Sequence, residues 1–375
     1  MVRRAKEYAS GALRVVVADD LGFMRIALRQ IIETDGDMRV VGEARDGREA
    51  VALTRELRPD IVTMDVEMPV MDGIEATRRI TEEVTPKPIV IIVSSHTQTG
   101  AAATLRALQS GAADFVSKQS AFTPTDLGQI DSELRRKIRL LAAQREPSPK
   151  RHATSALTNG DGTPLRLARP ACIPTGPIDL VAIGVSTGGP ATLSLLLRDI
   201  GPIAAPVVIA QHMPQFFTAC LADSLSQDTG LAIAEGVHRQ ALLPGMVTIL
   251  PGARDGVVAP GEGGGFELRL TQGDGPVHPS ADLLFESAAM AARRPVAVIL
   301  TGMGDDGARG AGRLAHRGLP VLVQRPETCV VGGMPGAAIE AGVATESLTL
   351  QQIARRLRRW AAPDYTPRNV EMADR

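Results

Sequence analysis

The chain has 375 residues, of which 44% are hydrophobic, and this length favours two domains rather than one. The formal net charge is −1 and 3% of residues are aromatic, so we expect no nucleic-acid partner. The three cysteines form neither a metal-binding cluster nor a disulfide framework, which favours a reducing compartment. No run approaches the ~20 apolar residues of a membrane span, and no apolar signal core follows the N-terminal arginines. We therefore expect a soluble, cytoplasmic protein without membrane insertion.

Residues 11–128 form the first predicted domain. Five apolar runs alternate there with five helical patterns, and this alternation is typical of a doubly wound α/β fold with a five-stranded parallel sheet. The predicted strands are residues 13–18, 39–41, 61–64, 89–93 and 115–116. The predicted helices lie near residues 23–33, 47–57, 73–83, 101–110 and after Pro124.

Polar residues follow the predicted strands of this domain, at the sheet edge where the chemistry of such folds gathers. They are Asp19 and Asp20 after the first strand, Asp65 after the third, Ser94 after the fourth and Lys118 after the fifth. Three converging carboxylates repel one another unless a hard cation such as Mg²⁺ lies among them. A lysine and a hydroxyl beside them can bind a phosphoryl group. Each residue alone is better explained as a loop cap, but together, at successive strand ends, they predict a phosphoacceptor site.

Three motifs of this domain strongly resemble those of bacterial response-regulator receiver domains. They are VVVADD at 15–20, MDVEMPVMDG at 64–73 and DFVSK at 114–118. The resemblance implies that Asp65 is the phosphoacceptor. It implies a Mg²⁺ site, required for phosphorylation, with these ligands: Asp19, Asp20, Asp65 and the backbone carbonyl of Glu67.

The same resemblance implies a switch apparatus beside the phosphoacceptor. It assigns the switch hydroxyl to Ser94, the switch aromatic to Phe115 and the phosphoryl-contacting lysine to Lys118. Gln119 follows this lysine, where receiver domains usually have proline. Because a cis peptide bond before a residue other than proline is costly, we expect a reshaped loop at this point.

Residues 129–176 are predicted to be the end of a helix followed by a linker. Residues 133–144 have a basic, helical pattern, whereas Pro, Gly, Thr, Ser and Arg dominate residues 145–176 without a sustained period. Such a composition is typical of an extended linker. Two roles remain open for it: a passive tether, or a segment that docks substrate or holds the domains together.

Residues 177–365 form the second predicted domain, again an α/β fold with a mainly parallel sheet. The strand-like runs are residues 178–185, 206–210, 246–250, 256–259, 266–270, 296–300 and 321–323. Glycines between the runs at 256–259 and 266–270 predict an antiparallel hairpin. Residues 348–360 predict a closing helix with four arginines around an apolar face, and we interpret it as a solvated surface helix rather than a DNA-binding one.

A glycine-rich turn, IGVSTGGP at 183–190, lies between a predicted strand and a predicted helix of this domain. Pro190 suits the first turn of that helix because its missing N–H would have no partner there. A serine facing the helix N-terminus can act as a nucleophile beside N–H groups that stabilise an oxyanion. The same turn can bind a phosphate, and taken alone it leaves both alternatives open.

Polar residues that follow two further predicted strands favour a catalytic serine over a phosphate-binding turn. Ser186 follows one strand, His212 follows the next, and the pair Asp305 and Asp306 follows a later one. A serine, a histidine and an aspartate on one sheet edge are the nucleophile, base and orienting carboxylate of a triad. A dinucleotide site would instead need an acidic residue about 20 residues beyond the glycine turn, and Asp199 comes too early for that.

Motifs of this domain, in this order, resemble those of the chemotaxis methylesterase catalytic domain. They are GVSTGGP at 184–190, QHM at 211–213, HPSAD at 278–282, LTGMG at 300–304 and GMP at 333–335. With the receiver in front, nearly the whole chain resembles the chemotaxis methylesterase family. The resemblance implies that Ser186 is the nucleophile, His212 the base and Asp306 the orienting carboxylate. It also implies that Thr187 and Met303 line the oxyanion and substrate site.

The resemblance also implies the function of the chain. We expect a phosphorylation-regulated serine hydrolase that demethylates glutamate methyl esters on chemoreceptors, and deamidates glutamines there, during chemotaxis adaptation. A chemotaxis histidine kinase would supply the phosphate, the unphosphorylated receiver would cover the esterase site, and the esterase chemistry would need no cofactor. The alternative is a phosphorylation-switched binding module that holds a nucleotide on residues 186–189.

Overall fold

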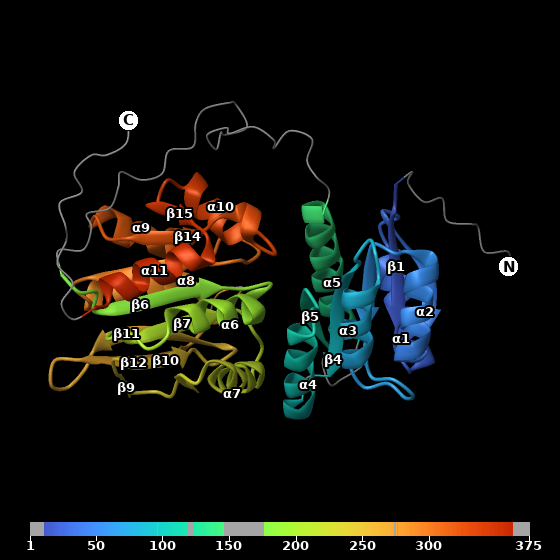
Figure 1. The fold of residues 1–375 in the computed structure, drawn as a ribbon, viewed down its shortest axis with the longest axis horizontal. Helices are drawn as coiled ribbons and strands as arrows, with labels where there is room; N and C mark the ends of the chain where they lie inside the picture. The colour runs from blue at the N-terminus through green and yellow to red at the C-terminus, as the bar shows by residue number, and fades with distance from the viewer. Residues whose placement is uncertain are drawn as a thin grey trace. The chain divides into compact units, whose positions relative to one another are not determined.

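The structure is a computed structural model that describes residues 11–95, 97–118, 124–145, 176–273, 275 and 277–362. The chain divides into two compact units, Met1–Pro149 and Lys150–Arg375, and both are α/β folds (Figure 1). In the described part of the chain, no helix combines the length and the apolar character that a membrane crossing requires.

Among its described residues, the first unit contains a five-stranded parallel sheet of order β2-β1-β3-β4-β5. The strands are β1 (Leu13–Ala18), β2 (Met38–Ala44), β3 (Ile61–Met64), β4 (Ile89–Ser95) and β5 (Asp114–Lys118). Because β1 lies inside the sheet, its residues Val15, Val16 and Val17 are fully buried. This order places the carboxyl ends of β1, β3, β4 and β5 side by side, and the predicted polar residues follow them.

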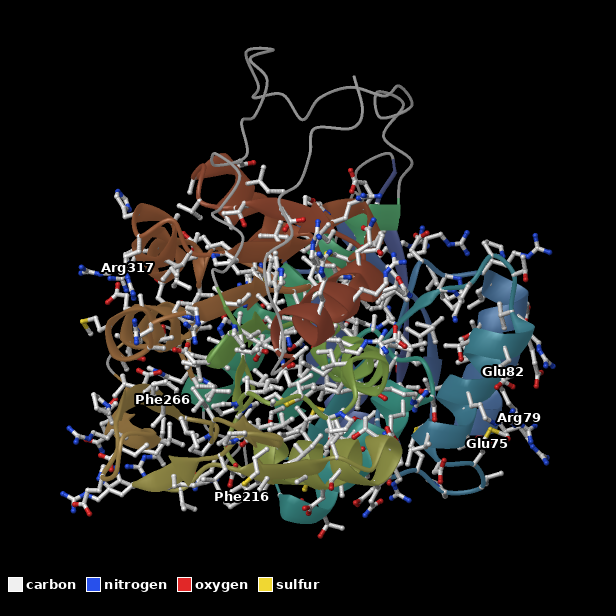
Figure 2. The ribbon with its side chains drawn as sticks, turned by 60° about the vertical axis from the view of Figure 1, so that its left-hand side comes forward. Glu75, Arg79, Glu82, Phe216, Phe266 and Arg317 are labelled. Carbon is white, nitrogen blue, oxygen red and sulfur yellow. The ribbon has the colours of Figure 1, made fainter. Side chains whose placement is uncertain are left out.

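Five helices alternate with these strands in the described residues of the first unit (Figure 1). Asp46 and Asp72 begin α2 and α3, and each side chain accepts a backbone N–H from the first turn of its helix. The outer face of α3 carries ion pairs between Glu75, Arg79 and neighbouring charged residues (Figure 2). The helices are α1 (Gly22–Ile32), α2 (Gly47–Leu57), α3 (Gly73–Glu83), α4 (Gln98–Gln109) and α5 (Pro124–Arg145).

In the described part of the second unit, a seven-stranded sheet has the order β15-β14-β13-β6-β7-β10-β8, and every pair in it is parallel. The chain proceeds from β6 to β7, β8 and β10 on one side, then returns to place β13 against the other side of β6. The carboxyl end of β6 is therefore a topological switch point, where open α/β sheets bind ligands. The strands are β6 (Leu180–Val185), β7 (Val207–Gln211), β8 (Ala232–Glu235), β10 (Met246–Ile249), β13 (Pro295–Ile299), β14 (Val321–Gln324) and β15 (Glu346–Leu348).

The predicted hairpin is present, and it belongs to a sheet of its own. In the described residues, β11 (Arg254–Pro260) and β12 (Phe266–Gln272) pair antiparallel, and β9 (Gln240–Leu242) adds a third strand to β12. Leu268 of β12 is fully buried in the core that the two sheets share. Phe285 of helix α8 (Ala281–Ala291) is fully buried in the same core. The helices of this unit are α6 (Gly189–Ile200), α7 (Phe217–Thr229), α8 (Ala281–Ala291), α9 (Ala308–His316), the short η1 (Pro326–Thr328), α10 (Gly333–Glu340) and α11 (Leu350–Trp360).

The domain boundaries at 128 and 176 remain predictions. Helix α5 continues to Arg145, so the residues from 129 onward begin as helix. Residues 146–175, which carry the predicted linker composition and Cys172, lie outside the described residues. The other two cysteines, Cys220 and Cys329, are half-buried and form no disulfide within the described residues.

Candidate active site

The register of two neighbouring strands brings Ser186 and His212 to the same edge of the second sheet. Val185 at the end of β6 lies opposite Gln211 at the end of β7, and the two residues follow directly. The backbone N–H of His212 donates to the Val185 carbonyl at 3.0 Å. The Gln211 side-chain amide donates to the Ser186 carbonyl, also at 3.0 Å. These bonds fix the backbone on both sides of the switch point.

Close backbone approaches surround Ser186. A Cβ atom on Gly189 would overlap the side-chain oxygen of Gln211, so a larger residue there would have to displace this buried side chain. A Cβ atom on Gly302 would lie 2.8 Å from the Ser186 Cβ and would overlap the Met334 sulfur. Ser186 itself is half-buried. Ser186 therefore lies just before α6, and the backbone of Gly302 packs against it.

His212 and Asp306 form a hydrogen-bonded pair at this edge. Nε2 of His212 lies 2.8 Å from Oδ2 of Asp306, and both side chains are largely buried, with 8% and 11% of their surface exposed. With Nε2 on the carboxylate, Nδ1 is the nitrogen left to act as a base. Burial alone would raise the pKa of Asp306, but the hydrogen bond from His212 and those from backbone N–H groups hold its pKa below the usual value.

Asp305 and Asp306 have different surroundings. Asp305 is exposed to solvent, and its carbonyl accepts the Ala308 N–H at 3.1 Å. Asp306 reaches His212 and also the N-terminus of α8, where it accepts the Ala281 N–H at 2.6 Å. This second attachment was not predicted from the sequence. A signal for it existed, because Ser280 followed by Asp282 is a pattern typical of a helix start.

The remaining predicted residues of this site lie nearby in the fold. Thr187 is 5% exposed, and its carbonyl accepts the Thr301 hydroxyl at 2.9 Å. The Thr301 carbonyl accepts a hydrogen bond from the Ser186 N–H at 3.0 Å. Met303 is 9% exposed, and it follows Gly302 in the segment that contacts Ser186. Their roles in oxyanion and substrate contact remain predictions.

A second cluster of functional side chains lies at the edge of the first sheet. Carboxylate oxygens of Asp19, Asp20 and Asp65 lie within 4.8 Å of one another. The Lys118 ammonium donates to Asp19 and to Asp65, each at 2.8 Å. Asp19 is fully buried, Asp65 is buried, and Asp20 is exposed at the mouth of the cluster. The structure therefore brings together four of the residues predicted for the phosphoacceptor site.

The charges of this cluster fit a divalent cation. Burial raises the pKa of Asp65 to about 6, with Asp19 adding to the effect, while the ammonium of Lys118 opposes it. One lysine leaves the set of three carboxylates with excess negative charge, and oxygen ligands at such a site suit Mg²⁺. Asp19, Asp20 and Asp65 would hold the ion. Glu67 is an exposed residue of the loop between β3 and α3, and the role of its carbonyl stays a prediction.

The predicted switch residues Ser94 and Phe115 are buried on the neighbouring strands β4 and β5. The Ser94 hydroxyl donates to the Gly100 carbonyl at 3.3 Å, and Ser94 is 1% exposed. Phe115 is 5% exposed, and the Lys137 ammonium lies 5.2 Å from its ring centre. Gln119, where we expect a reshaped loop, lies outside the described residues.

The folds and the two clusters define the class of this protein. A doubly wound sheet with an Asp/Lys cluster at its edge is the architecture of a receiver, and a second parallel sheet carries a Ser/His/Asp arrangement at its switch point. Family models match in the same order: "Response regulator receiver domain" over residues 15–128 and "CheB methylesterase" over residues 181–357.

Full-length relatives place the chain in a particular family. A "Protein-glutamate methylesterase/protein-glutamine glutaminase" of Nocardioides sp. is 39% identical, over 92% of this chain and 96% of the relative. One of Saccharophagus degradans is 38% identical over 92% and 99%, and one of Thermotoga maritima is 39% identical over 92% and 97%. The chain belongs to this family of protein-glutamate methylesterases and protein-glutamine glutaminases.

Proposed function

We propose that the chain hydrolyses methyl esters of glutamate side chains, and the side-chain amide of glutamine, in chemoreceptors during chemotaxis adaptation. The observation that carries this proposal is the His212–Asp306 pair, at 2.8 Å, on the strand end next to Ser186. The names of the relatives supply the substrate groups. The geometry supports Ser186, His212 and Asp306 as the residues that act on them.

The proposed reaction has two steps that share one histidine. In the first, Ser186 Oγ attacks the ester carbonyl while Nδ1 of His212 takes the hydroxyl proton, and this proton then leaves with the methoxide as methanol. In the second, His212 removes a proton from water, which attacks the acyl-enzyme and releases the glutamate carboxylate and Ser186. With glutamine the leaving group is ammonia instead of methanol.

Asp306 stabilises the imidazolium that forms in both steps and holds the ring with Nε2–H toward itself. Its lowered pKa keeps the carboxylate ionised at neutral pH. We place the developing oxyanion near the turn that precedes α6, because the positive dipole end of a helix favours negative charge there. Thr187 and Met303 then line the oxyanion and substrate site.

The first unit regulates this activity in our proposal. Asp65 accepts a phosphoryl group from a chemotaxis histidine kinase, and Lys118 contacts that group. Asp19, Asp20 and Asp65 would hold Mg²⁺, which would neutralise negative charge during the transfer. Without phosphate, the receiver covers the esterase site.

The test is methanol release from methylated receptor membranes. Ser186→Ala removes the nucleophile and should abolish release, with an unchanged circular dichroism spectrum as evidence of folding. Nucleotide binding to residues 186–189 is the competing proposal. Methanol release that persists in Ser186→Ala, together with saturable nucleotide binding to the parent chain, would favour that proposal instead.

A further inference from the structure

The carboxylate of Asp306 is attached to the first turn of α8 as well as to His212. Oδ2 accepts the Ala281 N–H at 2.6 Å, and Oδ1 accepts the Asp282 N–H at 3.0 Å. A helix N-terminus offers unpaired N–H groups and a positive dipole end, which favour an ionised carboxylate. The orientation of Asp306 toward His212 therefore depends on how the chain enters α8.

Ser280 is the residue at that entry. Its hydroxyl donates to Oδ1 of Asp306 at 3.1 Å, and its oxygen accepts the Leu283 N–H at 3.3 Å as the helix cap. Because the cap bond fixes the oxygen, the hydroxyl hydrogen is directed at Asp306. Oδ1 is thus held by Ser280 and Asp282, which leaves Oδ2 facing His212.

Ser280 is itself anchored to a buried carboxylate from the other sheet. Oδ1 of Asp255, at the start of β11, accepts the Ser280 N–H at 2.7 Å and lies 3.1 Å from Nδ1 of His278. Asp255 is 2% exposed. Hydrogen bonds therefore run from β11 through Ser280 to Asp306 and on to His212.

We propose that Ser280 is a positioning residue of the esterase site, whose hydroxyl sets the orientation of Asp306 toward His212. The inference rests on the proposed function, because Ser280 acts only through the orienting carboxylate. A hydrogen bond to a charged group is stronger than one between neutral groups. Losing it leaves the Asp282 N–H as the remaining partner of Oδ1 named above, so the carboxylate can rotate and its bond with the imidazole weakens.

The first experiment compares full-length variants by the initial rate of methanol release over a range of methylated receptor concentrations. Ser280→Ala should lower kcat roughly 10-fold with KM unchanged, as expected for loss of a hydrogen bond that acts in the transition state. Ser280→Thr keeps the hydroxyl and should retain most of the activity. Thr349→Ala is the matched control, since Thr349 caps α11 by the same kind of bond and should leave kcat unchanged.

The second experiment is a double-mutant cycle with Asp306→Asn. If Ser280 acts through Asp306, then Ser280→Ala causes little further loss of kcat in the Asp306→Asn background. Equal fold-losses in the two backgrounds, an unchanged kcat in Ser280→Ala, or an equal loss in Thr349→Ala would each overturn the positioning role. Full activity of Asp306→Asn would instead overturn the proposed triad, so the two failures are distinguishable.

Discussion

Asp305 and Asp306 are neighbours in the sequence, yet they meet different surroundings. Successive side chains at a strand-to-turn junction point in different directions, so only one of them reaches a given partner. Asp306 contacts His212, and Asp305 is exposed. The sequence motif selects the same residue, but composition alone leaves the choice between the two open.

This difference predicts opposite outcomes for two conservative substitutions. Asp306→Asn removes the charge that stabilises the imidazolium, and we expect kcat/KM to fall by ~10²–10⁴. Asp305→Asn should remain near the parent value. Both rates are measured on one methylated receptor preparation, with circular dichroism to verify folding. The reverse ranking would move the orienting role to Asp305.

Asp65 offers a second prediction at this scale. Asp65→Asn keeps the shape of the side chain but removes the acceptor carboxylate and one oxygen ligand of the proposed Mg²⁺ site. We expect activation by a small phosphodonor with Mg²⁺ to disappear while basal methanol release persists. In the parent chain, chelation of Mg²⁺ should have the same effect. Activation that survives in Asp65→Asn would mean that another residue accepts the phosphoryl group.

At the scale of elements, the segment after β13 packs against Ser186, and hydrogen bonds connect this segment to the start of helix α10. Gly302 follows this strand, and its backbone N–H donates to the Val331 carbonyl at 2.9 Å, while its carbonyl accepts the Met334 N–H at 3.0 Å. These bonds hold the start of α10 close to the nucleophile. A side chain at 302 has no room between Met334 and Ser186.

Gly302→Ala should therefore displace Ser186 without unfolding the sheet. We expect at least a 10-fold loss of kcat, because small displacements of reacting groups are costly to catalysis. Gly336→Ala is the matched control: a Cβ there meets nothing within 4 Å, and alanine suits the interior of α10. The control should keep its activity and gain about 0.5–1 kcal/mol of stability in urea unfolding. An active Gly302→Ala would show that the serine tolerates the displacement.

Helix caps illustrate why local sequence predicts elements well. Asp46, Asp72, Ser280 and Thr349 each begin a helix and accept an N–H from its first turn. Such bonds connect residues close in sequence, so their signals are readable without the fold. The short strands β8, β9 and β15 were not predicted, because most of their residues are half-buried or exposed and they form no apolar run. The equally short strands β3 and β14 were predicted, because all four residues of each are buried.

For the whole molecule, the prediction concerns regulation of one unit by the other. If the unphosphorylated receiver restricts the esterase site, a fragment beginning near Ile173 should release methanol faster than the unphosphorylated full chain. Regulatory coupling typically corresponds to roughly 5–150-fold in such a comparison. The rates are measured with and without a phosphodonor and Mg²⁺. Equal rates for the fragment and both forms of the full chain would exclude inhibition by the receiver.

The sequence by itself determined the class of both folds and the strand ends that carry chemistry. Apolar runs alternating with helical patterns predict parallel sheets, and polar residues just after the runs mark the sheet edge. Asp19, Asp65 and Lys118 were located in this way, and the structure brings them into contact. Ser186 and His212 were located in the same way.

Only the tertiary structure decided how the residues of the site come together and which other residues hold them. The order of the second sheet places β13 against β6, so Gly302 and Asp306 come to Ser186 and His212 from far along the chain. The attachment of Asp306 to α8, and of Ser280 to Asp255, depends on side-chain contacts between separate elements. Local periodicity reports which face of an element is apolar, but not which other element packs there, because that choice is made by the packing of the whole core.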